Sequence, residues 1–161
     1  DIDGPGALGT NFGAQFSVGR ASSTITNNAG VLLTQDVMLT AGTLYVFEFD
    51  WSAYRVAPGG TNTQGGIFDV VINGASVASQ AAGSTGPTNP HYGHIMGEFT
   101  ATTTGMHSVG AMITRPFTIP TPTAPNLFQV VDNFNMYVVP EPSTVLALGL
   151  GAFVLLRRRR K

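Results

Sequence analysis

Hydrophobic and polar residues alternate most regularly in Thr43–Ser52, where Tyr45, Phe47, Phe49 and Trp51 occupy every second position. Residues two apart in a strand point to the same side, so this pattern predicts a strand with its four aromatic side chains on one face. We interpret that face as part of a buried core. A platform for a ligand is the alternative. Trp51, at the end of the strand, is the residue whose assignment to the core is least strongly supported by the pattern.

Similar short apolar segments, separated by turn residues, predict the remaining strands. They are Ala14–Val18, Ser22–Thr26, Val31–Leu39, Ile67–Ile72, Ala75–Ala78, Ile95–Ala101, Met106–Thr114 and Leu127–Val139. Asn73-Gly74 lies between two of them and predicts a hairpin with a type I′ turn, because both central residues of that turn need positive φ. No helix is predicted before residue 143. The pattern therefore indicates an all-β sandwich over residues 1–139, followed by a tail over residues 140–161.

Three segments resemble jelly-roll modules of the galactose-binding and carbohydrate-binding type. Val31–Trp51 (VLLTQDVMLTAGTLYVFEFDW) resembles a strand pair of these modules, Phe99–Val109 (FTATTTGMHSV) their Thr-Gly-x-His hairpin, and Val131–Met136 (VDNFNM) their closing strand. Each motif is mainly a β-structural pattern. The resemblance therefore implies a single jelly-roll β-sandwich, and supports this fold more than it supports any ligand.

Charge is sparse and unevenly distributed. Charged residues make up 11% of the chain, against roughly 25% in a typical soluble domain. Residues 1–139 have a net charge of −5 and residues 140–161 a net charge of +4. An acidic body with scattered arginines does not fit nucleic-acid binding. The chain has no cysteine, which excludes disulfides and thiolate sites. It begins at Asp1, as expected either of a mature protein whose signal peptide was removed or of a fragment.

The tail, VVPEPSTVLALGLGAFVLLRRRRK over residues 138–161, has three parts. The prolines of Pro140-Glu141-Pro142 end the preceding strand, and Ser143 or Thr144 can cap a helix. Val145–Leu156 then has no charged residue. As a helix it would span about 18 Å, short of a hydrocarbon core of about 30 Å. Arginine snorkelling could supply part of the difference. A buried core helix is the alternative, but the cations that follow would have to leave the core at once.

This tail resembles the PEP-CTERM sorting signal, in which a Pro-Glu-Pro motif precedes a short hydrophobic helix and an arginine-rich end. The resemblance implies that Pro140, Glu141 and Pro142 are recognised by a membrane processing enzyme of the exosortase type. It also implies that the hydrophobic segment holds the protein transiently in the inner membrane. The orienting charges would be Arg157, Arg158, Arg159, Arg160 and Lys161. Proteins with this signal are exported to the surface or extracellular matrix of Gram-negative bacteria that make exopolysaccharide. Similar tails are also described as an ice-binding-protein carboxyl-terminal domain.

Candidate catalytic residues are few. His91 and His94 form a His-x-x-His pair with Glu98 nearby, but no second metal-binding motif supports a site, so we interpret them as structural. Glu48 and Asp50 lie about 7 Å apart by strand rise, a spacing common to every i, i+2 pair. We therefore predict that the protein is not an enzyme. A polysaccharide-acting hydrolase is one alternative, and an ice-binding protein, which needs a larger flat array of threonines, is another.

Calcium is the one metal that the jelly-roll resemblance implies, as a structural ion; no other cofactor is expected. By that resemblance Asp132 in the closing strand would bind calcium together with Asp1 and Asp3. The alternative is that Asp132 caps a turn or accepts a hydrogen bond from the backbone of Asn133.

A glycan site, if the sandwich has one, is expected where aromatic residues remain near loops. These are Trp51, Tyr54 and Tyr92, with Arg55 or His91 available to orient sugar hydroxyls. The alternative is that Trp51 and Tyr54 cover one end of the core. The sequence as a whole predicts an exported surface or matrix protein whose sandwich is a non-catalytic module associated with exopolysaccharide.

Overall fold

The computed structural model describes residues 13–19, 29–56, 63–86, 88–115 and 127–140. Within these ranges the chain forms β-strands and no helix, which confirms the all-β prediction. The strands are β1 (Ala14–Phe16), β2 (Ala29–Leu39), β3 (Leu44–Arg55), β4 (Ile67–Ile72), β5 (Ala75–Ala81), β6 (His91–Thr100), β7 (Gly105–Arg115) and β8 (Leu127–Val138). No helix in the described ranges is long and apolar enough to cross a membrane. The predicted strand Ser22–Thr26 and the predicted apolar helix Val145–Leu156 lie outside them.

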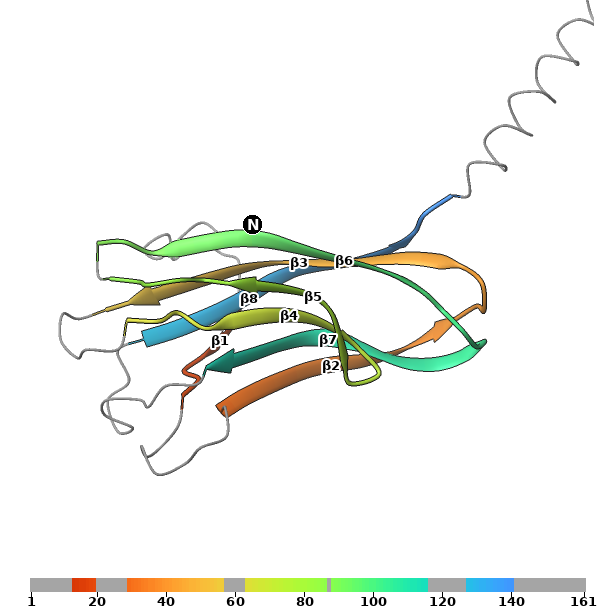
Figure 1. Cartoon of the computed structure of the whole chain (residues 1–161), viewed down its shortest axis with the longest axis horizontal. Coiled ribbons are helices and arrows are strands. Elements are labelled where there is room, and N and C mark those ends of the chain that lie inside the picture. The colour runs from red at the N-terminus through yellow and green to blue at the C-terminus, as the bar shows by residue number, and fades with distance from the viewer. Residues whose placement is uncertain (1–12, 20–28, 57–62, 87, 116–126, 141–161) are drawn as a thin grey trace, which may run out of the picture.

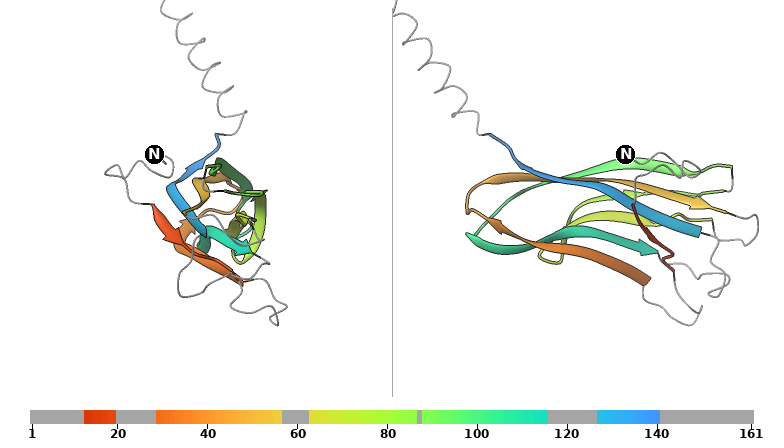
Figure 2. Two further views of the ribbon diagram at one scale, coloured as in Figure 1. Left: turned by 90° about the vertical axis from the view of Figure 1, so that its left-hand side faces the viewer. Right: turned by 180° about the vertical axis from the view of Figure 1, so that it is seen from behind.

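The strands form two four-stranded antiparallel sheets, in the orders β1-β8-β3-β6 and β2-β7-β4-β5. They run along the long axis of the molecule, and the β2–β3 and β6–β7 turns lie together at one end (Figure 1). One hydrophobic cluster contains buried residues of both sheets, including Phe49 of β3 and Val70 of β4. Figure 2 shows both sheets curving around this shared interior.

Strand alternation builds the core as the sequence predicts. Tyr45, Phe47, Phe49 and Trp51 of β3 are all at most 8% exposed. The Trp51 ring stacks on Phe68 of β4, with ring centroids 4.6 Å apart and planes inclined by 19°. This stack joins the two sheets, since β3 and β4 belong to different ones. The interpretation of the aromatic face as core is confirmed.

One hairpin turn and one close contact between strands show why their residues are needed. Asn73 and Gly74 have φ values of 50° and 82°, as the predicted type I′ hairpin between β4 and β5 requires. His107 is buried beside this turn. Its Nδ1 accepts a hydrogen bond from the Asn73 side-chain amide, and its Nε2 lies 3.0 Å from the Thr103 carbonyl oxygen. A Cβ atom on Gly110 would lie 1.9 Å from the Leu33 carbonyl oxygen, so β2 and β7 approach too closely there for any side chain.

Some strand boundaries differ from the sequence-based prediction. The sequence predicts one strand that ends at Ala78 and a next one that begins at Ile95, yet β5 continues to Ala81 and β6 begins at His91. The early part of β6 pairs with the end of β3, where Gly93 lies opposite Trp51 and His91 opposite Ala53. Glycine and histidine have weak strand preferences, so pairing with a distant strand decides this segment.

Candidate functional site

The outer face of the β1-β8-β3-β6 sheet carries a connected group of polar side chains. Because odd-numbered residues of β3 face the core, Glu48 and Asp50 face outward. Asp50 lies opposite His94 of β6, and Glu48 lies opposite Asn135 of β8. We call Glu48, Asp50, His94, Asn133 and Asn135 the His94 cluster.

Hydrogen bonds connect every member of this cluster. His94 Nδ1 donates to Asp50 Oδ1 at 2.8 Å, while His94 Nε2 lies 3.4 Å from Glu48 Oε2. The Asn133 side-chain amide donates to Asp50 Oδ2 at 2.9 Å, and the Asn135 amide donates to Glu48 Oε1 at 3.1 Å. The imidazole therefore bridges two carboxylates, and each carboxylate is held from its other side by an asparagine.

This geometry favours the protonated imidazole. Carboxylate oxygens only accept hydrogen bonds, so both ring nitrogens of His94 can donate only when the ring is cationic. The hydrogen bond to Asp50 is the main reason that the pKa of His94 is raised, and the charges of Asp50 and Glu48 add to it against partial burial. Burial raises the pKa of Asp50, but hydrogen bonds from Asn133 and His94 and the charge of His94 together lower it below its ordinary value.

A bulge in β8 brings the two asparagines to this face. The pairing of β3 with β8 shifts in register between Glu48 and Asp50, and Asn133 has a φ of 53° there. After the bulge Phe134 points inward, with its ring 6.1 Å from that of Phe47. Asn133 and Asn135 are left on the outer side, where they contact the carboxylates.

Exposed aromatic rings lie on the same face, beyond both ends of the His94 cluster. Tyr92 of β6 is 62% exposed, opposite Ser52, and Tyr137 of β8 is 43% exposed, opposite Val46. Ser52 and Val46, the residues opposite the two tyrosines, are six positions apart in β3, which corresponds to about 20 Å along the strand. The surface thus offers rings for stacking and, between them, several hydrogen-bonding groups.

Alternation divides the predicted glycan residues between two faces. Tyr54 and Tyr92 lie on the outer face, where the Tyr54 hydroxyl donates to Gln15 Oε1 at 3.1 Å. Trp51 and Arg55 are at most 6% exposed, and Trp51 Nε1 donates to Gln80 Oε1 at 2.9 Å. Trp51 as a surface stacking residue is therefore wrong, and its alternative role as a core residue is the one observed. Arg55 is likewise no surface residue. His91 is partly buried and shares the inward set of β6, where its Nε2 lies 3.1 Å from the Asn89 amide.

Of the three predicted calcium ligands, Asp132 lies within the described residues. Those residues contain no group of three or more His, Cys, Asp or Glu side chains that could hold a metal ion. His91 and His94 belong to opposite faces of β6, so the two rings do not form one His-x-x-His site. Asp132 Oδ1 accepts the backbone N–H of Asn133 at 2.8 Å, the alternative expected for this residue. Its predicted calcium partners Asp1 and Asp3 lie outside the described residues.

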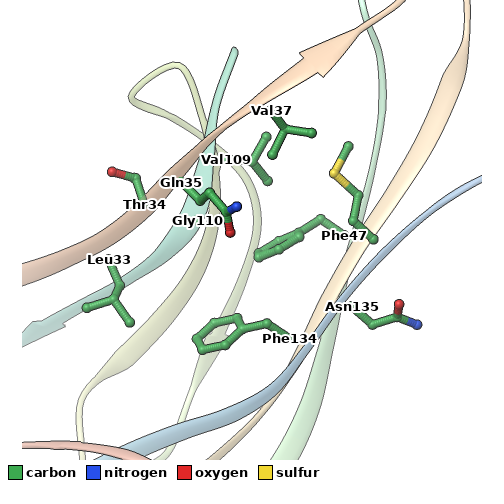
Figure 3. Close-up of a pocket in the computed structure, with 10 residues that line it drawn as sticks. Leu33, Thr34, Gln35, Val37, Phe47, Val109, Gly110, Phe134 and Asn135 are labelled. Atoms are coloured by element: carbon green, nitrogen blue, oxygen red, sulfur yellow. The ribbon is translucent and has the colours of Figure 1, made fainter. Parts of the chain in front are cut away.

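A groove lies between the two sheets, beside the His94 cluster (Figure 3). It has a volume of about 290 Å³ and is lined by Leu33, Thr34, Gln35, Val37, Phe47, Val109, Gly110, Phe134, Asn135 and Met136. It opens where β2 is the edge of one sheet and β8 has passed its last pairing with β1 at Val131. Most of this lining is apolar, and the Asn135 amide is directed away from the groove to Glu48. The groove offers a polar ligand fewer partners than the outer face does.

Comparison with known proteins identifies the last part of the chain. Residues 138–161 match the family described as the PEP-CTERM protein-sorting motif. The chain carries a PEP-CTERM sorting signal. This signal implies an exported protein that is processed by an exosortase. The resemblance stated from the Pro-Glu-Pro motif and the arginine-rich end is confirmed.

The structure describes only the beginning of the sorting signal. Val138 ends β8, and the backbone N–H of Val139 donates to the Leu44 carbonyl at 2.9 Å. The signal thus starts directly at the sheet, with Pro140 as its first proline. Glu141, Pro142 and Arg157–Lys161 lie outside the described residues.

The fold itself has counterparts among solved structures. One is titled "EclA C-terminal domain; sugar-binding protein", with a TM-score of 0.53, 14% sequence identity and coverage of 84% of each chain. At this identity the similarity shows a shared fold. None of the curated proteins compared with the chain matches it.

Proposed function

We propose that this protein is an exosortase substrate of the bacterial envelope whose sandwich binds polysaccharide without catalysis. The apolar segment Val145–Leu156 holds it in the inner membrane until processing releases it to the surface or matrix of a Gram-negative cell. The sorting signal supports the first half of this proposal. The sandwich and its outer face support the second half.

The observation that carries the binding role is the outer face of β8, β3 and β6. Tyr92 and Tyr137 expose their rings there, and the His94 cluster lies between them. Sugar rings present apolar C–H faces and polar hydroxyl edges, so aromatic rings beside amides and carboxylates suit them. The face is a sheet surface, and both carboxylates are already engaged in hydrogen bonds, which suits binding better than hydrolysis.

The fold supports the same role. β8 lies beside β1 in one sheet, and β7 lies beside β2 in the other, an order that agrees with the jelly-roll assignment. A solved structure with the same fold is titled a sugar-binding protein.

Binding to a panel of soluble and insoluble polysaccharides tests the proposal. The full chain is kept in micelles of a polyoxyethylene detergent, because sugar-headed detergents would compete. Tyr92→Ala and Tyr137→Ala should each weaken binding about 5–30-fold, as expected for the loss of a central aromatic contact. Met106→Ala is the matched control, since Met106 is 61% exposed on the other sheet.

Two results would contradict the binding role. One is equal binding by the wild type and by the double variant Tyr92→Ala/Tyr137→Ala, and the other is the absence of binding to every polysaccharide tested. Calcium enters the same proposal through Asp132 with Asp1 and Asp3. The melting temperature in calcium compared with that in a chelator tests this part.

A further inference from the structure

Two turns lie together at the end of the sandwich that is on the right of Figure 1. Residues 40–43 connect β2 to β3, and residues 101–104 connect β6 to β7. The turns are joined directly, because the backbone N–H of Gly42 donates to the Ala101 carbonyl at 2.8 Å. Both sheets therefore end together here, since β2 and β7 belong to one sheet and β3 and β6 to the other.

The sorting signal leaves the sandwich at this same end. Val139, the first residue after β8, donates its backbone N–H at 2.9 Å to the carbonyl of Leu44, the first residue of β3. Leu44 follows the β2–β3 turn and lies opposite Thr100, which precedes the β6–β7 turn. The chain thus enters the signal beside both turns. We call residues 40–43, 101–104 and 138–140 the tail end of the sandwich.

Only a short stretch of chain connects the tail end to the apolar segment of the signal. That segment begins at Val145, six positions after Val139. A fully extended chain covers at most about 3.6 Å per residue, so Val145 lies no more than about 22 Å from the paired Val139. The sandwich itself is longer, because the 12 residues of β3 span about 40 Å. A membrane that holds the apolar segment is therefore always within reach of the tail end.

The described residues of the tail end include no Asp, Glu, Lys or Arg. The stretches without these residue types are 37–47, 99–114 and 133–140. The outer faces of the two sheets differ from this end, because one carries Glu48, Asp50 and Glu98 and the other carries Asp36. Bringing a carboxylate to a lipid surface costs desolvation, and anionic lipids repel it. The tail end can therefore approach a bilayer at lower cost than either outer face.

Apolar side chains are exposed at the tail end and directly beside it. Met38 and Met106 lie opposite each other in β2 and β7, next to the last pair of these strands, and are 64% and 61% exposed. Val138, the last residue of β8, is 51% exposed. The turns and their flanks also contain Thr40, Thr43, Thr100, Thr102, Thr103 and Thr104. Flexible methionines adapt to irregular apolar surroundings, and neutral hydroxyls can hydrogen-bond to lipid headgroups, so this composition suits the boundary between water and lipid.

We propose that the tail end of the sandwich rests on the lipid headgroups of the inner membrane while the apolar segment anchors the protein. This inference rests on the anchoring part of the proposed function. The strands, which run along the long axis, then rise from the bilayer (Figure 1). The outer face of β8, β3 and β6 stays open to the surrounding polysaccharide, with Tyr92 about 20 Å farther from the lipid than Tyr137.

Fluorescence quenching by lipid tests this orientation in the full chain. The chain has no cysteine, so Thr102→Cys and Thr88→Cys each provide a single site for a fluorophore. Both positions are exposed; Thr102 belongs to the tail end, and Thr88 precedes β6 at the opposite end. Each labelled chain is reconstituted into vesicles of phosphatidylethanolamine and phosphatidylglycerol, with or without phosphatidylcholine that carries a nitroxide on its headgroup. Quenching should be at least about threefold greater at position 102, because the length of the strands separates position 88 from the bilayer.

A charge introduced beside the tail end distinguishes lipid contact from proximity. With the label at position 102, Met38→Glu should reduce quenching at least about twofold, because a carboxylate is poorly accommodated at the lipid surface. Leu32→Glu is the matched control and should leave quenching unchanged. Leu32 lies on the same face of β2 as Met38 and is 50% exposed, but it is six positions, or about 20 Å, farther from the tail end.

Equal quenching at positions 102 and 88 would overturn the proposal, as would equal effects of Met38→Glu and Leu32→Glu. Protection of position 102 that occurs only after an exosortase is added to the vesicles would also overturn it and assign the tail end to the enzyme. Flotation of the vesicles separates this inference from the proposed function. A chain that does not float with the vesicles refutes the anchor and the orientation together, whereas a chain that floats without a difference between the two positions refutes the orientation alone. The assay contains no polysaccharide, so failure of the binding role does not affect it.

Discussion

Replacing Phe68 with alanine should destabilise the sandwich more than most single substitutions, because this ring joins the two sheets. Phe68 is fully buried, and its ring stacks on Trp51 with centroids 4.6 Å apart. Truncating a buried phenylalanine costs about 3–5 kcal/mol through lost transfer free energy and the cavity left behind. Phe68→Leu keeps most of the apolar volume and removes the stacking, which is worth about 0.5–1.5 kcal/mol. The expected order of stability is therefore wild type, then Phe68→Leu, then Phe68→Ala.

Urea unfolding measures these differences directly. Trp51 is the only tryptophan of the chain, and it is 3% exposed, so its fluorescence reports loss of the core on unfolding. Tyr92→Ala is the control, since Tyr92 is 62% exposed and its truncation should change stability by less than about 0.5 kcal/mol. A loss below about 1 kcal/mol for Phe68→Ala would refute the argument that the Trp51–Phe68 stack joins the two sheets in one core.

Three further predictions concern the tail and the outer face. Alanines at positions 140–142 should leave export intact but block processing, because recognition is lost while the apolar segment remains. Mass spectrometry of the mature wild-type protein tests the sorting interpretation, and a mature protein that still contains residues 157–161 would contradict it. The pKa of His94 is raised, so its interaction with the carboxylates stabilises the fold fully at pH values below the ordinary pKa of 6.5. This stabilisation is lost as the pH rises through the raised pKa. The pKa of Asp50 is lowered, so its ionised carboxylate stabilises the fold fully at pH values above the ordinary pKa of 3.8. This stabilisation is lost as the pH falls through the lowered pKa. The excess melting temperature of the wild type over His94→Gln should therefore be largest between pH 3.8 and 6.5, and an excess that persists at alkaline pH would count against the pairing. Asn133→Val should lower the melting temperature more than Asn133→Gly does, because the φ of 53° is unfavourable for a β-branched residue; equal melting temperatures would exclude strain at the bulge.

The fold could be predicted where local patterns agree with the final packing. The alternation of β3 identified its buried face, and Asn73-Gly74 identified a type I′ hairpin whose φ values are both positive. Local patterns failed at His91–Gly93, which has few strand-forming residues but pairs with the end of β3. Such pairing depends on a partner some forty residues away in the chain, and no local propensity contains that information.

The candidate site was harder to predict, although the sequence pattern points to three of its residues. The pattern groups Glu48 with Asp50, as two carboxylates on one strand, and His94 with His91. The strand register shows that His94 belongs with the carboxylates and not with His91. Alternation alone could have placed His91 and His94 on opposite faces. Only the non-local order β8-β3-β6 brings the two asparagines and the imidazole to the same carboxylates.

The bulge at Asn133 is the local feature on which this site depends. The buried Val131 and the inward ring of Phe134 are three positions apart, an odd interval that regular alternation does not allow. Without the extra residue, Phe134 and Met136 would face solvent, and Asn133, Asn135 and Tyr137 would face the core. The single inserted residue therefore both completes the apolar interior and supplies the outer face with its amides and one of its aromatic rings. The sequence alone does not contain this signal, because Val130 and Val131 are both apolar and either face could be assigned to the residues before Asp132. The register shift between β3 and β8, which depends on the pairing of distant strands, is what reveals that the two amides of the His94 cluster lie on the outer face.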